Sequence, residues 1–275
     1  MPELPEVETS RRQVRVALLG RRIDSVQVAE DSIVFVEAPP LAVTAFCQGS
    51  HVTDVGRKGK LMWLTLDGTR HLGLHLGMSG RIFARQDHTN RSVAYRHAAT
   101  PNEKFHKLTV HAADSEVRLD DPRRLARVWL LSDADLGAKL GKLGPDALDD
   151  LPSPEELMAR WGRKSTPIKA ALLDQAVVSG IGNYLADEVL YQSRIAPARE
   201  CRSLSRDEAE RLWAAIQQVC RLAVAAEADA QKYPAEWLFH VRWGKGREGD
   251  TINGESIVWT DIGCRTTAWV PTVQR

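Results

Sequence analysis

The sequence is poor in cysteine and in net charge, and both shortages limit what the protein can be. Its four cysteines are scattered without a close pair. This arrangement supports neither a disulfide framework nor a zinc site, and it favours a reducing cytosol. The formal net charge is +1, with 37 Lys and Arg residues against 36 Asp and Glu residues. Total charge therefore neither supports nor excludes a nucleic-acid partner, and a DNA-binding protein of this composition must gather its basic residues on one face.

Long apolar runs are also missing. No stretch approaches the roughly 20 apolar residues that a membrane-spanning helix needs. The first ten residues, MPELPEVETS, are acidic and lack the apolar core of an export signal. With 43% hydrophobic and 27% charged residues in 275, the chain suits a globular protein of one large or two medium domains. We therefore expect no membrane association.

The first half of the chain changes from a helical to a strand-like pattern. Apolar residues at helical spacing, followed by Gly20, predict a helix over residues 5–19. From about residue 23 to residue 131 apolar and other residues alternate with a period of two, and Asp67-Gly68 marks a hairpin turn. These features predict an antiparallel β-sandwich domain, preceded by a helix, over residues 1–136.

The second half opens with a stretch rich in Gly, Pro and Asp, which predicts a linker over 137–152. Helix-capping signals begin at Ser153 and Ser205 and predict a helical domain over 153–241. In the final stretch, 242–275, Asn253-Gly254 and Asp261-Ile262-Gly263 mark turns between short strands. The expected fold class is α+β, with a β-hairpin after the helical domain.

The N-terminus offers a nucleophile. Removal of Met1 would expose Pro2, whose secondary amine can attack an electrophilic carbon and form an iminium ion. Glu3 and Glu6 lie close by in sequence, and a carboxyl group near a reacting amine can act as general acid or base. Taken alone, these residues are more typical of an ordinary helix start with favourable acidic residues.

The N-terminal block as a whole resembles a known family. MPELPEVETSRR is similar to the start of formamidopyrimidine-DNA glycosylase and its endonuclease VIII relatives. Further segments that resemble the family follow in the same order: Gly59-Lys60, His75-Leu76-Gly77-Met78-Ser79-Gly80, Asp121-Pro122-Arg123-Arg124, Leu143-Gly144-Pro145-Asp146 and Ser179-Gly180-Ile181-Gly182-Asn183-Tyr184. The resemblance implies a bifunctional DNA glycosylase and AP lyase of base excision repair, acting on double-stranded DNA with oxidised bases or abasic sites.

The resemblance also implies catalytic roles. Pro2 would attack C1′ of the damaged nucleotide, displace the base and hold the sugar as a Schiff base. Glu3 would move protons at the deoxyribose, and Glu6 would steady the base pocket and the N-terminal loop. Lys60 would contact the phosphate near the lesion, although its basic neighbourhood, Arg57-Lys58-Gly59-Lys60, is by itself more typical of a solvated charge run.

DNA contacts are implied in both halves. Asn183, at the mouth of a helix in the helix-two-turn-helix motif, would bind phosphate, since a helix N-terminus favours an anion. Lys169 matches the family lysine near the lesion, and His75 is expected among the DNA contacts. The remaining implied contacts fill the space left by the extruded nucleotide. They are Met78, Arg123 and Leu125.

Two positions depart from the family pattern. Leu125 stands where the family usually has an aromatic residue, which puts stacking on the opposite strand in doubt. Most bacterial members end in a zinc finger with two cysteine pairs, whereas this chain has only Cys264 there. Its last segment resembles the zincless finger of plant members, in which Trp259 and Trp269 would pack in place of the metal and Arg265 would grip a phosphate. We therefore expect no metal and no cofactor.

Two other readings compete with the enzyme. A catalytically silent, lesion-sensing protein of the same fold stays open, because retained Met1 would block the amine of Pro2. A metal-dependent nuclease is disfavoured, because the eight histidines form no ligand-spaced cluster with carboxylates. We expect a monomer, located in the cytoplasm with the nucleoid in a bacterium or in the nucleus of a eukaryote. The preferred lesion, the opposite base and the choice between β- and β,δ-elimination stay open.

Overall fold

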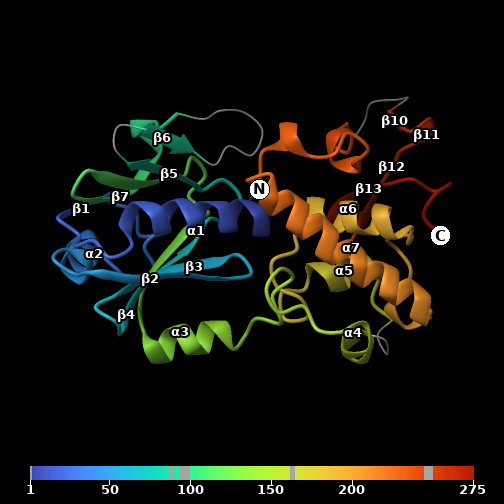
Figure 1. Cartoon of the computed structure of the whole chain (residues 1–275), viewed down its shortest axis with the longest axis horizontal. Coiled ribbons are helices and arrows are strands. Elements are labelled where there is room, and N and C mark those ends of the chain that lie inside the picture. The colour runs from blue at the N-terminus through green and yellow to red at the C-terminus, as the bar shows by residue number, and fades with distance from the viewer. Residues whose placement is uncertain (1, 87–88, 93–99, 162–164, 245–249) are drawn as a thin grey trace. The chain divides into compact units, whose positions relative to one another are not determined.

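The computed structural model describes the chain except for residues 1, 87–88, 93–99, 162–164 and 245–249. The chain divides into two compact units, which Figure 1 colours from blue to red along the sequence. Unit 1 comprises residues 1–142 and 227–229, and unit 2 comprises 143–226 and 230–275. Among the described residues no helix combines the length and the apolar character needed to cross a bilayer.

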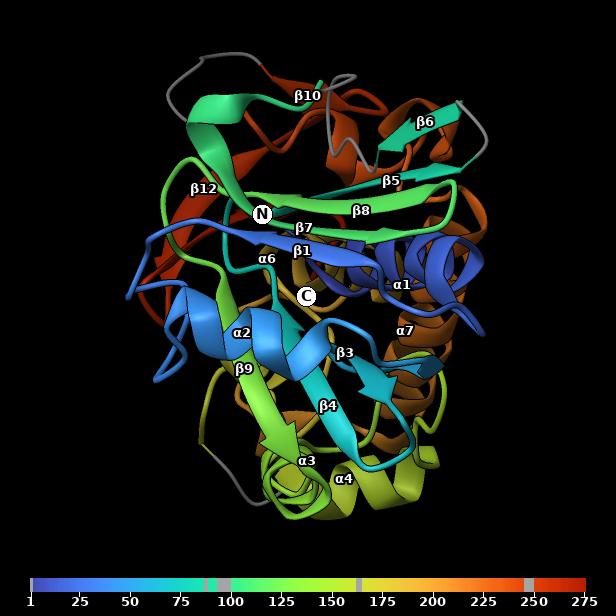
Figure 2. The same ribbon diagram turned by 90° about the vertical axis from the view of Figure 1, so that its left-hand side faces the viewer.

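Unit 1 is built on two antiparallel sheets, which Figure 2 shows as separate layers. In the described residues one sheet has the order β1-β7-β8-β5-β6 and the other the order β2-β3-β4-β9. The strands are β1 (Ser25–Val28), β2 (Val52–Lys58), β3 (Leu61–Leu66), β4 (Arg70–His75), β5 (Arg81–Gln86), β6 (Thr89–Ser92), β7 (His106–Ala112), β8 (Ser115–Asp120) and β9 (Arg127–Ser132), with a 3₁₀ turn η1 (Glu103–Phe105) before β7. The sandwich expected from the alternating pattern is confirmed.

Helix α1 (Leu4–Leu18) packs against strands of both sheets, namely β2 and β3 of one and β5 and β8 of the other. Pro5 stands in its first turn, where the missing N–H costs no helical hydrogen bond. Val7, Val14 and Leu18 are buried in a core shared with both sheets. The helix expected from this spacing is confirmed, and its burial holds the first residues of the chain against the sandwich.

Two helices lie where the sequence pattern predicted none. Helix α2 (Pro40–Cys47) interrupts the stretch expected to be all β, because Pro40 starts a helical turn that buries Val43 and Cys47. Helix α3 (Asp133–Leu140) occupies the beginning of the expected linker 137–152. Its start is stabilised by a capping box between Ser132 and Asp135, which the glycine-rich composition further on conceals.

Unit 2 contains the helices α4 (Pro154–Trp161), α5 (Ile168–Leu173), α6 (Asn183–Ser193) and α7 (Arg206–Ala225), with 3₁₀ turns η2 (Cys201–Ser203), η3 (Ala230–Lys232) and η4 (Leu238–His240). The backbone N–H of Ser153 donates to Glu156 over 2.9 Å, and Ser205 and Glu208 form a capping box. Both expected helix starts are confirmed. The buried stripe on α7, which includes Leu212, Ile216 and Val219, packs as core.

The last segment forms two hairpins, β10 (Thr251–Ile252) with β11 (Glu255–Ser256) and β12 (Val258–Ile262) with β13 (Arg265–Trp269). Asn253 and Gly254 both have positive φ, as the expected turn requires. The turn expected at Asp261-Ile262-Gly263 starts two residues later in the structure. Ile262 pairs with Arg265, so that Gly263 and Cys264, both with positive φ, make the turn.

Candidate active site and nucleic-acid interface

Pro2 is half-buried and directly precedes α1. The backbone N–H of Glu3 donates to the Glu6 carboxylate over 2.8 Å, and Val7 N–H donates to the Glu3 carbonyl over 3.1 Å. Glu3 and Glu6 are only 1% and 2% exposed. Glu6 therefore fixes the peptide that follows Pro2. Its role at the base pocket stays a prediction. Met1, whose removal would expose the amine, lies outside the described residues.

Lys60 lies in the two-residue turn between β2 and β3, where Lys58 pairs with Leu61. Gly59 has φ 57°, a conformation that glycine adopts without strain and that this type of hairpin turn requires. Arg57 donates to the Gly59 carbonyl over 2.9 Å, and its side chain is 1% exposed. The basic run is therefore not solvated throughout. Its one arginine has a buried side chain and holds the turn that carries Lys60.

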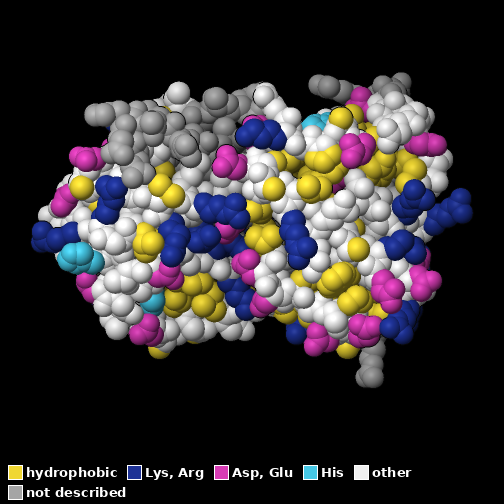
Figure 3. All heavy atoms as spheres, in the orientation of Figure 1, with side chains coloured by type: hydrophobic (Ala, Val, Ile, Leu, Met, Phe, Trp, Pro, Cys, Tyr) yellow, Lys and Arg dark blue, Asp and Glu magenta, His cyan; other side chains and the backbone are white. Residues whose placement is uncertain are grey.

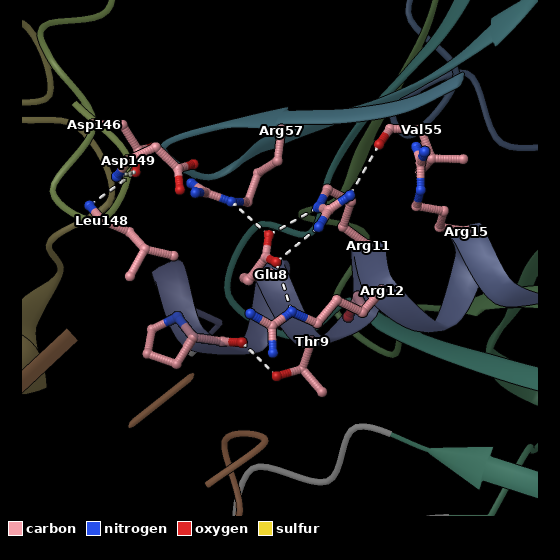
Figure 4. A network of polar contacts seen from close by, with 12 residues as sticks. Glu8, Thr9, Arg11, Arg12, Arg15, Val55, Arg57, Asp146, Leu148 and Asp149 are labelled. Atoms are coloured by element: carbon pink, nitrogen blue, oxygen red, sulfur yellow. Dashed lines mark hydrogen bonds and ion pairs between the residues drawn. The ribbon is translucent and has the colours of Figure 1, made fainter. Parts of the chain in front are cut away.

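Glu8 connects this turn to α1, as Figure 4 shows. Its carboxylate accepts hydrogen bonds from Arg11 and Arg12 on α1, each over 2.8 Å, and from Arg57 on β2 over 3.1 Å. Burial acts to raise the pKa of Glu8, but the arginine hydrogen bonds and charges outweigh it and lower that pKa to about 2. The carboxylate thus stays charged at neutral pH and links the helix behind Pro2 to the Lys60 turn.

Lys and Arg side chains gather over α1 on the face that Figure 3 presents. The basic residues of this helix, Arg11, Arg12 and Arg15, each bond to a carboxylate, the last to Asp54 over 2.6 Å. Paired cations attract phosphate less than their number suggests. The number of basic side chains on this helix is therefore not, by itself, evidence of a DNA-binding surface.

His75 ends β4 opposite Leu61, the residue that follows Lys60. Burial, together with the positive charges of Lys60 and Arg127, lowers the pKa of His75 to about 4, so its imidazole is neutral at pH 7. The backbone N–H of Gly77 donates to its Nδ1 over 3.1 Å. This contact leaves the proton on Nε2, which can donate to a phosphate oxygen or a carbonyl. His75 is thus a neutral hydrogen-bond donor beside a lysine.

The three expected space-filling residues stand on two loops joined by one carboxylate. Met78 and Arg123 are exposed, and Leu125 is half-buried. Asp121, 1% exposed, accepts from Ser79 Oγ over 2.5 Å, from Arg123 N–H over 3.1 Å and from Ala126 N–H over 2.6 Å. A Cβ on Gly77 would lie 2.2 Å from the carbonyl oxygen of Leu125, so only glycine permits this approach. The structure therefore brings Met78, Arg123 and Leu125 together on one rigid pair of loops.

A second carboxylate braces the same loops. Arg124, with φ 56°, donates to Asp31 over 2.9 and 3.0 Å, and Lys107 donates to Asp31 over 2.9 Å. Burial acts to raise the pKa of Asp31, but these cations hold it well below its usual range. Asp31 lies far from the matching motifs in sequence, and nothing in its local pattern marks it.

In unit 2, Asn183 is the first residue of α6. The turn before it is ordered by Gln175, which accepts from Gly180 N–H over 2.9 Å and donates to the Ile181 carbonyl over 2.8 Å. Asn183 Nδ2 donates to the Thr266 carbonyl on β13 over 2.9 Å, which leaves its buried Oδ1 without a protein partner among the described residues. Asn183 thus stands at a helix N-terminus, as expected, and its contact with phosphate stays a prediction.

Lys169 does not stand in a position to meet DNA directly, and this expectation needs correction. Its side chain is 0% exposed and forms a salt bridge with Asp187 on α6. Arg242 donates to the same carboxylate, with its Nε at 3.0 Å. Sequence reasoning missed Asp187 and Arg242. In the sequence, Asp187 is marked only as a charged residue on the apolar face of a helix. Arg242 is marked only as a charged residue beside an aromatic run.

Arg265 is exposed at the start of β13, beside the Gly263–Cys264 turn. Cys264 is exposed, whereas Cys47, Cys201 and Cys220 are buried in separate elements. Within the described ranges, no three His, Cys, Asp or Glu side chains are grouped so that they could hold a metal ion. Trp259 donates its indole N–H to the Arg242 carbonyl over 3.0 Å and packs on the small finger core, as expected for a structural tryptophan.

Comparison with known proteins places both units in one family. Residues 1–128 match the family model of the formamidopyrimidine-DNA glycosylase N-terminal domain, and residues 143–235 match the model of its H2TH domain. A formamidopyrimidine-DNA glycosylase of Arabidopsis thaliana is 36% identical over 281 residues, covering 100% of this chain and 71% of that protein. One of Herpetosiphon aurantiacus is 35% identical over 286 residues and covers 100% of both.

Solved structures share the fold. The Lactococcus lactis Fpg in complex with DNA containing an abasic site superposes with a TM-score of 0.83, at 23% identity and with 100% of both chains covered. With both family models matched and relatives above 30% identity along the whole chain, the chain belongs to the formamidopyrimidine-DNA glycosylase family.

Proposed function

We propose that this chain is a bifunctional DNA glycosylase and AP lyase of base excision repair, acting on duplex DNA with oxidised bases or abasic sites. The observation that carries the proposal is the N-terminal block. A proline that becomes a secondary amine is followed by two buried glutamates, one of which fixes the adjoining peptide. A secondary amine beside carboxyl groups is suited to iminium chemistry, and the block falls inside the family match to residues 1–128.

The steps follow from this chemistry. The Pro2 nitrogen bonds to C1′ of an extruded nucleotide while the bond from C1′ to the base breaks, and the departing base takes up a proton. The amine nitrogen then loses its proton, the bond from C1′ to O4′ breaks as the nitrogen forms a double bond to C1′, and O4′ takes up a proton, which gives the Schiff base. Removal of a C2′ proton expels the 3′-phosphate, and a second elimination expels the 5′-phosphate. We assign the proton transfers at the sugar to Glu3. Lys60 is assigned to the phosphate near the lesion, and His75 is assigned a hydrogen bond to the DNA.

Borohydride trapping on duplex DNA with an abasic site tests the proposal. The wild-type protein without Met1 should give a covalent protein–DNA adduct, and Pro2→Gly should give much less. A matched control carries two extra residues before Pro2, which convert the Pro2 nitrogen to an amide and keep every side chain. This control should bind DNA without forming the adduct. If the wild-type protein binds the duplex without an adduct, the chain is instead the catalytically silent, lesion-sensing protein.

We also propose a substrate preference. Bacterial enzymes that favour 8-oxoguanine carry a long Gly-rich lid between the last helix and the finger. The matching stretch of this chain, residues 230–247, is short and lacks a Gly-rich centre. Its described part packs into an aromatic cluster in which Tyr233 lies 5.0 Å from Trp237 and 4.9 Å from Phe239, centroid to centroid. These side chains are at most 5% exposed, so this part of the segment is used for packing. Residues 245–249 lie outside the described residues.

Without a lid, a flat and chemically stable lesion gains few contacts to its base edge. Formamidopyrimidines and hydantoins depend less on such contacts, because their base–sugar bonds break more easily and they disturb the duplex themselves. An abasic site has no base edge to contact. We expect all three to be processed faster than 8-oxoguanine opposite cytosine. Single-turnover excision of 8-oxoguanine and of a hydantoin in the same duplex measures this, and equal or faster excision of 8-oxoguanine would contradict the preference.

We also propose a partner, an oligomeric state and a location for the chain. The chain is expected to act as a monomer on DNA, in the cytoplasm with the nucleoid of a bacterium or in the nucleus of a eukaryote. The neutral His75 Nε2 and the exposed Arg265 are the groups that support DNA binding most directly. Size-exclusion chromatography with and without an abasic-site duplex would test the monomer.

A further inference from the structure

The finger formed by β12 and β13 is too small to be stable without contacts to the rest of unit 2. Each strand has five residues, and an isolated two-stranded hairpin is marginally stable in water. The family's usual zinc does not fit these residues. Cys264 alone stands in the hairpin, in an exposed turn, and the described residues contain no group of three metal-binding side chains. Something else must dock the finger on the helical part of unit 2.

A buried carboxylate stands at that junction. Asp187 on α6 is fully buried and bonds to three separate parts of unit 2. It forms a salt bridge with Lys169 on α5, accepts from Arg242 Nε over 3.0 Å, and accepts from the backbone N–H of Ala268 on β13 over 3.3 Å. One side chain thus joins two helices, the segment after η4 and the finger.

The partners of Asp187 reach the finger a second time. Lys169 Nζ donates to the Thr266 carbonyl over 3.4 Å, and Asn183 Nδ2 donates to the same carbonyl over 2.9 Å. The Arg242 carbonyl accepts from the Trp259 indole over 3.0 Å. Thr266 directly follows Arg265, so these contacts fix the backbone from which the Arg265 side chain projects.

Charge makes the carboxylate indispensable. Lys169 and Arg242 are two buried cations, with side chains 0% and 5% exposed, and Asp187 contacts both. Burying a cation without a counter-charge is strongly unfavourable. Four thiolates around zinc would order the hairpin from within, whereas one carboxylate between two cations holds the finger on the helical part of unit 2 through buried charge.

We propose that Asp187, with Lys169 and Arg242, forms an ion cluster that replaces the zinc of the finger, and that Asp187 is thereby a positioning residue for Arg265 and Asn183. The inference rests on the proposed function, because it assumes that these two residues contact DNA. It assigns to Lys169 an internal role in place of direct contact with the lesion strand.

Asp187→Asn tests the cluster, with Asp207→Asn as the matched control, because Asp207 is an exposed carboxylate of the same unit. Binding to a duplex with a tetrahydrofuran abasic analogue should weaken about ten- to a hundredfold in Asp187→Asn, the scale of losing charge-assisted contacts. The slope of log K against log salt should fall by about one, as for loss of one phosphate contact. The single-turnover rate of strand cleavage at saturating enzyme should change little, since the residues at the sugar lie in unit 1.

A double variant separates positioning from a general structural effect. If Asp187 acts through Arg265, then Asp187→Asn combined with Arg265→Ala should bind no more weakly than the weaker of the two single variants. Hydrogen exchange should show faster exchange of the Ala268 amide with α7 still protected. If Asp187→Asn does not fold, Lys169→Met with Asp187→Asn restores the net charge of the cluster and must show the same loss of binding.

Unchanged binding and salt slope in Asp187→Asn, or losses that multiply fully with those of Arg265→Ala, would overturn the inference. Failure of the proposed function has a different signature: the wild-type protein gives no borohydride adduct, whatever stands at position 187. Hydrogen exchange of the free protein tests the docking of the finger in either case.

Discussion

Glu188, next to Asp187 on α6, should make the stability of unit 2 depend on pH. Its side chain is 0% exposed. One carboxyl oxygen accepts from Gln192 Nε2 over 2.7 Å and the other from Phe239 N–H over 2.8 Å. Burial outweighs these bonds, which act to lower the pKa, and with the nearby charge of Asp187 it raises the pKa of Glu188 from 4.5 to about 7.

The sign of the effect follows from where the proton is bound. Between pH 4.5 and about 7 the folded protein keeps the Glu188 proton and the unfolded chain has lost it, so stability falls as pH rises through this window. The shift from 4.5 to about 7 corresponds to about 3 kcal/mol, lost by pH 7 and constant above it. The Glu188→Gln variant has no such proton to lose.

Urea unfolding of both proteins at pH 5, 6, 7 and 8 would measure this. The free energy of unfolding of Glu188→Gln, minus that of the wild type, should rise by about 2–3 kcal/mol from pH 5 to pH 8. The Gln192 amide can rotate to accept from the new amide group, so both variants keep two hydrogen bonds. Glu236→Gln, an exposed carboxyl near η4, is the control and should show no such trend. A difference that does not change with pH would refute the reasoning.

Three further predictions follow from single features. Asp121→Asn should slow cleavage of a duplex lesion about tenfold but spare trapping on a single-stranded abasic site, which needs no extrusion; equal losses on both would contradict the wedge assignment. Arg265→Ala should lower the slope of log K against log salt by about one, and an unchanged slope would show that it meets no phosphate. Purified protein should contain no stoichiometric zinc by elemental analysis, and chelators should leave its activity unchanged.

Long periodic patterns in the sequence were sufficient to predict most of the fold. The helix before the sandwich, the alternating strands and the capped helices α4 and α7 all follow from local rules. Helix α2 could not be predicted in this way, because its eight residues carry no polar face and read equally well as a strand. Helix α3 was missed because its glycine and the residues that follow it have the composition of a linker. The capping box of Ser132 and Asp135 nevertheless starts a helix there.

Two motif glycines are explained by their own backbone positions. Positive φ at Gly59 and the 2.2 Å approach of a Cβ on Gly77 to a neighbouring carbonyl leave glycine as the residue that fits. Sequence reasoning missed residues whose role depends on distant partners. Asp31 is 76 and 93 residues from its two cationic partners, and Asp187 is 81 residues from the finger amide it accepts. No local pattern encodes pairings at such separations.

Because local sequence patterns do not reveal such pairings, they also do not reveal how many of the predicted DNA contacts carry a charge. Apart from the residues that fill the space of the extruded nucleotide, five residues were expected to contact the DNA, namely Lys60, His75, Lys169, Asn183 and Arg265. His75 is neutral because its pKa is about 4, and Lys169 is balanced inside the cluster of Asp187. Asn183 carries no charge, whereas Arg265 is an exposed cation. At roughly 0.9 per neutralised phosphate, loss of Arg265 should lower the slope by about one. Phosphate contacts by Lys60 and Arg265 together correspond to a slope of about two, so a much steeper slope in the wild type would show that further cations contact phosphate.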